Sequence, residues 1–141
     1  MAPLDVAAAR PQLDAALRAA GTPDRADEEK RYLKSDLRHF GTSMPAIHRV
    51  TRAFSDAHPE STRADLRALV EELWDAGVHE LRMTAVELMT LRSGLLEPEA
   101  DVAWLEPRLA RASGLTVREA CKHLPEATRE ALLTARRAAA S

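Results

Sequence analysis

Cysteine, glycine and aromatic side chains are all scarce in this chain of 141 residues. With Cys121 as its only cysteine, the chain has no partner for an internal disulfide and no metal site built on cysteine, so we expect a reducing, cytoplasmic location. None of its five glycines belongs to a glycine-rich phosphate loop. The small number of aromatic and β-branched residues also argues against a β-sheet.

Long apolar runs are missing as well. The first 20 residues are rich in alanine but are interrupted by Asp5, Arg10, Pro11 and Asp14. This stretch offers no apolar core for a signal peptide or a membrane span, so we expect no membrane partner.

The residues that are abundant are typical of a helical protein. Ala, Leu, Arg and Glu dominate, and Gly and Pro fall mainly between stretches with helical periodicity. The length fits one domain. Capping residues, glycines and prolines divide the sequence into about seven or eight helices. We therefore predict an all-α fold.

The expected helices follow one another over short turns. They are 4–20, kinked or restarted at Pro11; 23–40; one capped by Ser43; one opened by Ser61 or Thr62 and closed at Gly77; 78–92; one from Pro98 to about Leu109; one opened by a capping box at Thr116; and 126 to about 138. Apolar residues on two sides of 78–92 predict a central, buried helix. Short turns favour antiparallel helix pairs, arranged either as a helical-repeat solenoid or as a compact bundle.

Charge is segregated along the chain although the net charge is only −2. Residues 30–52 hold six Lys/Arg and one acid, 53–107 hold four and twelve, and 108–141 hold seven and three. Two basic blocks therefore flank an acidic one. If the basic blocks meet in space, they form a surface for a polyanion.

Three stretches resemble one known family. The first, 31–49, reads RYLKSDLRHFGTSMPAIHR, with a tyrosine, a lysine, an aromatic-glycine pair, a proline and an arginine in order. The second, 69–88, places a Leu-Trp pair before a helix bearing glutamate and alanine, and the third, 114–124, contains Arg-Glu-Ala followed by Lys-His. In these features the chain is similar to the AlkD-like DNA alkylation-repair proteins. The resemblance implies a truncated HEAT-like solenoid, with N-terminal repeats over 1–112 and a closing segment over 113–141.

The chain departs from that family after Trp104. Family members usually carry several more repeats there, whereas this sequence passes from Leu109 through four residues to Gly114. In the family, the missing stretch holds a Trp-x-x-x-Asp motif whose carboxylate and indole act on the lesion. No catalytic residue can therefore be assigned, and Trp74 and Trp104 are predicted to be structural.

The resemblance does imply a DNA-binding surface. Tyr32 matches a family position near the lesion-bearing nucleotide, and nearby cations suit phosphate contacts. The predicted DNA-binding residues are Tyr32, Lys34, Arg38, Arg49, Arg52, Arg118 and Lys122, with Lys30 beside them. The alternatives are a half-buried tyrosine and merely solvated cations. No metal or cofactor is predicted, because the five histidines and the acidic pairs lack ligand spacing.

The leading hypothesis is a helical protein that binds alkylated duplex DNA. The family resemblance implies excision of N3- or N7-alkylated purines, but the absent motif predicts that this chain lacks full glycosylase activity. The main alternative is a noncatalytic helical protein-interaction module, and a third is retained catalysis with Tyr32. Exposed repeat surface also suggests a homo-oligomer.

Overall fold

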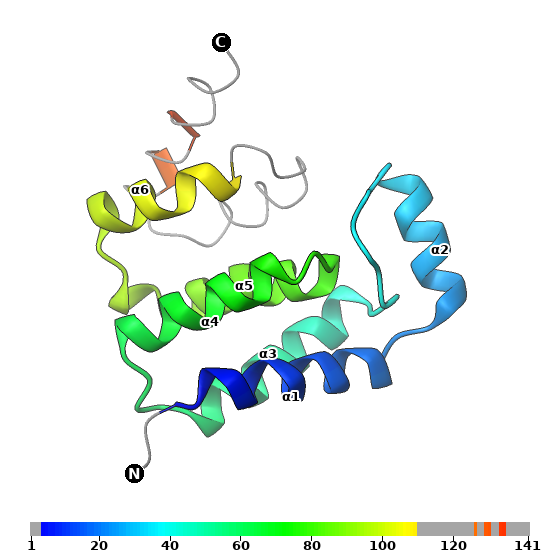
Figure 1. Cartoon of the computed structure of the whole chain (residues 1–141), viewed down its shortest axis with the longest axis horizontal. Coiled ribbons are helices and arrows are strands. Elements are labelled where there is room, and N and C mark those ends of the chain that lie inside the picture. Colours follow the sequence, from blue (N-terminus) through cyan, green and yellow to red (C-terminus); the bar gives the residue numbers. More distant parts are fainter. Residues whose placement is uncertain (1–3, 110–125, 127–128, 131–132, 135–141) are drawn as a thin grey trace. The chain divides into compact units, whose positions relative to one another are not determined.

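The computed structural model describes residues 4–109, 126, 129–130 and 133–134. Within that part of the chain the elements are all helical: α1 (Val6–Ala19), α2 (Pro23–Tyr32), α3 (Met44–Ala57), α4 (Arg63–Asp75), α5 (His79–Leu91), the 3-10 helix η1 (Ser93–Leu95) and α6 (Pro98–Leu109). Figure 1 shows them in order along the chain. The predicted all-α fold is confirmed.

The chain divides into two compact units, Met1–Leu91 and Arg92–Ser141. The first holds α1 to α5, and the second holds η1 and α6. The division that the sequence predicts at 112/113 falls among residues outside the described ones and stays a prediction. The helix predicted from Thr116 also lies outside them, while residues 126, 129–130 and 133–134 of the predicted last helix are helical.

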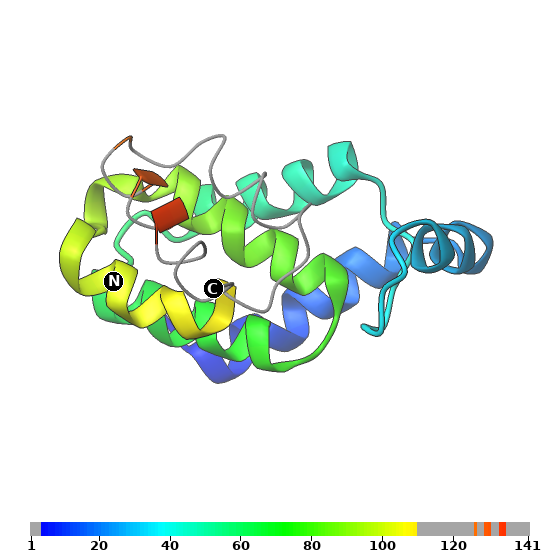
Figure 2. The same ribbon diagram turned by 90° about the horizontal axis from the view of Figure 1, so that it is seen from above.

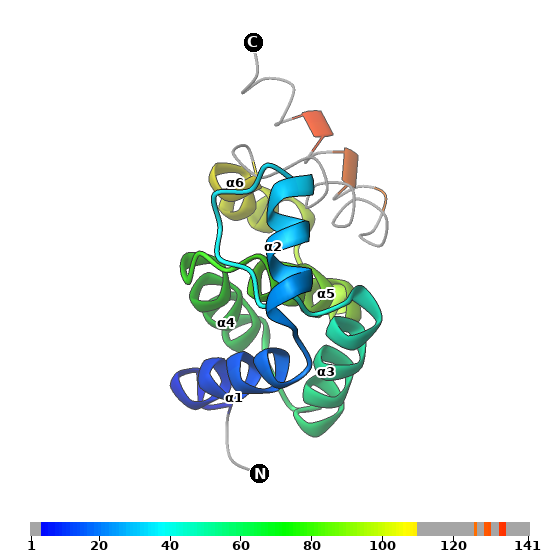
Figure 3. The same cartoon turned by 90° about the vertical axis from the view of Figure 1, so that its right-hand side faces the viewer.

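The first unit is built from two antiparallel helix pairs. In Figure 1, α1 and α4 run in one direction while α3 and α5 return in the other. Seen end-on in Figure 3, α1 and α3 form one row and α4 and α5 the next. The closest packing joins α4 to α5, α3 to α5, α1 to α4 and α1 to α3. The predicted antiparallel pairs are confirmed, and their stacking matches a helical-repeat solenoid.

The hydrophobic core of this unit lies between the two rows. Ten of the thirteen residues of α5 are buried, which confirms that it is the central helix. The largest apolar side chains that are fully buried in this unit are Leu13, Leu17, Ile47, Leu69, Leu73, Leu81, Met83 and Met89. Such burial contributes about 1.5–3 kcal/mol for each large apolar side chain and is the main source of stability.

Side-chain caps fix where the helices begin. Thr22 and Ser43 accept a hydrogen bond from the backbone N–H three residues later, at the starts of α2 and α3. Thr62 and Asp65 form a full capping box at the start of α4. The capping positions predicted at Ser43 and Thr62 are confirmed. Pro11 lies inside α1, which continues to Ala19 without restarting.

The predicted second helix is too long. α2 ends at Tyr32, so Leu33, Leu37 and Phe40 belong to the segment that connects it to α3 and not to a helix face. Figures 1 and 2 show α2 standing to one side of the paired helices, joined to them by this segment. None of the ten residues of α2 is buried.

A Schellman motif ends α2 without a glycine. The N–H of Ser35 donates to the carbonyl of Lys30 at 3.0 Å, and that of Lys34 donates to Arg31 at 3.2 Å. Lys34 takes the left-handed conformation that this motif requires, with φ of 50°. Because glycine is the usual residue at this kind of helix end, the sequence predicted that the helix continues as far as Gly41.

No helix among the described residues is both long enough and apolar enough to cross a membrane.

Candidate functional site

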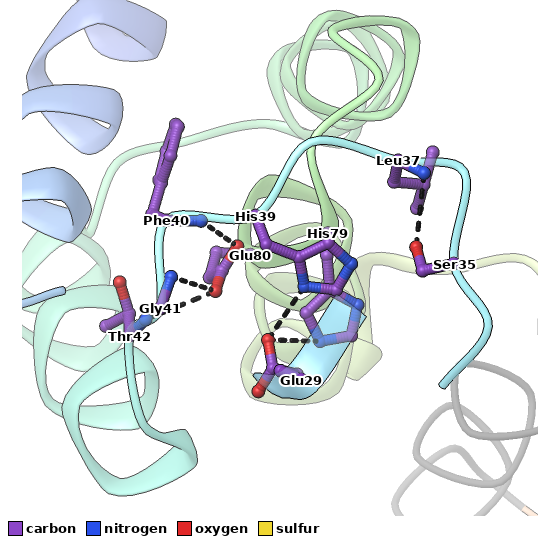
Figure 4. A network of polar contacts seen from close by, with 9 residues as sticks. All are labelled: Glu29, Ser35, Leu37, His39, Phe40, Gly41, Thr42, His79 and Glu80. Atoms are coloured by element: carbon purple, nitrogen blue, oxygen red, sulfur yellow. Dashed lines mark hydrogen bonds and ion pairs between the residues drawn. The ribbon is translucent and has the colours of Figure 1, made fainter. Parts of the chain in front are cut away.

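The carboxylate of Glu80 anchors the segment that leads into α3. Glu80 is fully buried, and its oxygens accept hydrogen bonds from the backbone N–H groups of Phe40 at 2.9 Å, Gly41 at 3.0 Å and Thr42 at 3.2 Å. Figure 4 shows these three bonds. A buried carboxylate is costly unless it is well hydrogen-bonded, and three backbone donors meet that need.

Close backbone contacts hold the same segment against the start of α2. A Cβ on Gly41 would lie 2.0 Å from the carbonyl oxygen of Thr22, and Gly41 has φ of 76°. The hydroxyl of Thr42 donates to the carbonyl of Leu17 at 2.6 Å. Gly41 is therefore required both by its backbone angle and by the lack of space.

A short backbone bridge holds the middle of the connecting segment. The N–H of Arg38 donates to the carbonyl of Gly77 at 3.0 Å, and the carbonyl of Arg38 accepts from the N–H of His79 at 2.9 Å. These bonds join the segment to the turn between α4 and α5. The backbone of residues 38–42 is thus fixed on both sides, whereas its outward side chains are not.

Three predicted DNA-binding residues lie at the end of α2 and in the segment after it. Tyr32 is 87% exposed, and it is the large hydrophobic residue that stands out on the surface of the described chain. Lys34 and Arg38 are also exposed. The alternative of a half-buried tyrosine is therefore wrong.

The other described cations of the prediction lie on α3. Arg49 and Arg52 are exposed and three residues apart, so they share one side of the helix. Ile47 and Thr51 face the core. His48, beside them, lies with its Nδ1 3.0 Å from a carboxylate oxygen of Glu87.

Within the described part of the chain, several cations of the unit lack an anionic partner, including Arg25, Lys30 and Arg31 of α2 as well as the predicted DNA-binding ones. Among the described residues, none forms an ion pair with Lys34, Arg38, Arg49 or Arg52. Arg18 by contrast pairs with Asp14 at 2.5 Å and lies over the ring of Phe40. Arg118 and Lys122 lie outside the described residues.

The two tryptophans and the clustered acids serve the fold. Trp74 is buried, and the guanidinium of Arg82 lies 4.7 Å from its ring centre and donates to its carbonyl. Trp104 is buried too. The carboxylate of Asp101 accepts a hydrogen bond from the N–H of Glu97 at 2.6 Å, just before α6 begins. The burial of Trp74 and Trp104 agrees with the structural roles predicted for them, whereas Asp101 is fully buried and does not lie on a solvated helix face.

The interpretation of the histidines as scattered is wrong for two of them. The rings of His39 and His79 stack with centroids 4.7 Å apart and an interplanar angle of 14°. Glu29 Oε1 lies 2.9 Å from His39 Nδ1 and 3.8 Å from His79 Nε2, as Figure 4 shows. Because these residues come from α2, the connecting segment and α5, no spacing in the sequence predicts that they lie together.

Burial controls the electrostatics of this group. Removal from water lowers the pKa of His79, while the carboxylates of Glu29 and Glu80 act in the opposite direction and His39 acts with burial. The side chains of His39 and His79 are 1% and 5% exposed, and that of Glu29 is 20% exposed. His79 is therefore favoured as a neutral imidazole with a lone pair available.

Comparison with known proteins connects the chain to one family. A family model described as DNA alkylation repair enzyme matches residues 13–113. The match includes α2, the connecting segment and α3, and hence Tyr32 and the four described cations. No curated protein and no solved structure gives a significant match.

Proposed function

The chain belongs to the family of DNA alkylation repair enzymes, and from that membership we propose that it binds duplex DNA carrying N3- or N7-alkylated purines without completing their excision. The observation that carries the proposal is an exposed aromatic residue, Tyr32, within a basic block whose predicted DNA-binding cations have no anionic partner among the described residues. The general role in DNA alkylation repair follows from the family. The binding mode and the lack of full activity are our inference.

The cations supply the electrostatic part of binding. Lys34 and Arg38 follow α2, and Arg49 and Arg52 lie on α3, all within the basic block 30–52. Each cation that neutralises a phosphate releases counterions, so affinity falls steeply with salt. Arg118 and Lys122 in the closing segment are proposed to add to this surface.

Tyr32 supplies an aromatic face for the lesion. N3- and N7-alkylated purines carry a positive charge, and a cation is attracted to the face of an aromatic ring. The side chain stands at the end of a helix with no buried residue, so it is free to meet a ligand. Its contribution is selectivity for the alkylated base, whereas the cations bind any duplex.

Excision also requires stabilisation of cationic character on the deoxyribose, which a nearby carboxylate provides. Of the described acids, Glu80 already holds three backbone N–H groups and Asp101 holds another. The family motif that would bring the catalytic carboxylate cannot be assigned in this sequence. We therefore propose a DNA-binding protein without full glycosylase activity.

Two measurements on the untagged chain test the proposal. The first is duplex affinity as a function of salt, with Lys34, Arg38, Arg49 and Arg52 replaced together by Gln. If all four contact phosphates, the slope of log affinity against log salt falls by about 3.6. A charge-matched control replaces four cations of α1 and α4, namely Arg10, Arg18, Arg63 and Arg67, and should retain most of the slope. Salt-insensitive association would contradict DNA binding and favour a protein-interaction module.

The second measurement is release of 7-methylguanine and 3-methyladenine from methylated duplex DNA, with protein in excess. Release at the spontaneous rate by folded protein supports binding without excision. Release well above it would show that the chain holds a working catalytic site, and Tyr32→Phe and Tyr32→Ala would then ask whether the ring takes part.

A further inference from the structure

We propose that Glu29, His39 and His79 form a binding site for one divalent transition-metal ion, of which Zn²⁺ is the best candidate. One ligand atom from each residue lies within 4.8 Å of the other two. The three residues come from α2, the connecting segment and α5. This inference does not depend on the proposed function.

The donor set decides the kind of ion. Two imidazoles and one carboxylate form a known zinc set, with the fourth position left for water. Imidazole ligands suit Zn²⁺, Cu²⁺ and Ni²⁺, whereas Mg²⁺ and Ca²⁺ prefer oxygen ligands throughout. Glu29 is the most exposed of the three, so the open position and the path of entry lie on its side.

The distances are close to those that a bound ion needs. In a tetrahedral site with bonds of about 2.1 Å, two ligand atoms lie about 3.4 Å apart. Here Glu29 Oε1 lies 2.9 Å from His39 Nδ1 and 3.8 Å from His79 Nε2. Binding would require side-chain rotations that bring the three atoms closer together and turn the two stacked rings so that both point at the ion.

Burial gives a second, independent reason. The side chains of His39 and His79 are 1% and 5% exposed, so an ion between them and Glu29 would be held largely out of water.

An ion at this position would fasten α2 to the rest of the unit. α2 has no buried residue, and the Glu29 side chain is its contact with the histidines. Binding that requires the folded arrangement stabilises it by mass action. The effect that we expect from the ion is therefore stabilisation of the position of α2 in the unit.

The test uses the untagged full chain, freed of metal with a chelator and titrated with Zn²⁺ by calorimetry. We expect one ion per chain and, at about 100 times the dissociation constant, a rise of about 5–10 °C in the melting temperature. Co²⁺ should give the visible bands of a tetrahedral site with nitrogen ligands. Absence of stoichiometric binding would overturn the proposal.

Variants locate the ion. Glu29→Gln and His39→Gln are expected to weaken binding at least ~100-fold, because loss of an outer partner of a ligand already costs ~10–100-fold. Glu28→Gln and His58→Gln are the matched controls and should bind as the unaltered chain does. If His39→Gln does not fold, Glu29→Gln decides, because its side chain is partly exposed. Unchanged binding by Glu29→Gln, or equal loss in the controls, would place the ion elsewhere.

Discussion

Replacing Glu80 by Gln tests how the segment before α3 is held. Gln has nearly the same shape, but it keeps one acceptor oxygen and places an NH₂ group where the second oxygen was. The carboxylate uses one oxygen for the N–H of Phe40 and the other for those of Gly41 and Thr42. At least one of the three backbone donors must therefore lose its acceptor.

The expected cost follows from the number of bonds lost. A hydrogen bond to a charged group contributes about 1.5–3 kcal/mol, and a buried donor left without a partner adds about 1–3 kcal/mol. If the Gln oxygen keeps Gly41 and Thr42, only the bond from Phe40 is lost and the remaining bonds become weaker. We expect Glu80→Gln to lower the free energy of unfolding by about 3 kcal/mol.

Urea unfolding followed by circular dichroism measures this change. The control is Glu72→Gln, which removes a surface carboxylate whose oxygen lies 3.9 Å from Arg10. Because exposed ion pairs contribute little, that variant should change the free energy of unfolding by less than about 0.5 kcal/mol. A loss below about 1 kcal/mol for Glu80→Gln would refute the view that the buried carboxylate organises residues 40–42.

Four further substitutions separate strain, space and charge. Gly77→Ala should lower the free energy of unfolding by about 1 kcal/mol, because only the backbone angle is strained and a Cβ there meets nothing within 4 Å. Gly41→Ala should lower it by about 2–4 kcal/mol, because its Cβ also overlaps a carbonyl oxygen. Equal losses in the two variants would contradict this difference in space. Lys34→Gly should relieve the left-handed residue and raise the melting temperature by about 2–3 °C, and a lower melting temperature would argue against the strain. Arg49→Gln should reduce the salt dependence of duplex binding by about 1 in slope, and an unchanged slope would remove that residue from the interface.

Local sequence signals predicted much of the first unit. Ser43 and Thr62 were identified as helix starts, and the apolar pattern of 78–92 identified the central helix. These features depend on residues three to eight positions apart, which a sequence displays directly. The predicted second helix was too long because α2 ends at a left-handed Lys34, and no glycine in the sequence marks that end.

The features of the site that were missed all depend on long-range contacts. Glu80 accepts hydrogen bonds from backbone N–H groups about 40 residues earlier, and no side-chain pattern in the sequence identifies those groups as its partners. His39 and His79 are equally distant in sequence and meet only because the connecting segment lies against the start of α5. The family resemblance predicts a binding role for Tyr32, and the structure shows that its side chain is exposed.

The lack of buried residues in α2 also affects how the protein can evolve. A substitution in a core helix is limited by its effect on stability, because most proteins tolerate only a few kcal/mol of loss. Substitutions on the outer sides of α2 are nearly free of that limit. The helix that ends at Tyr32 can therefore change its surface chemistry while the paired helices of the unit stay the same.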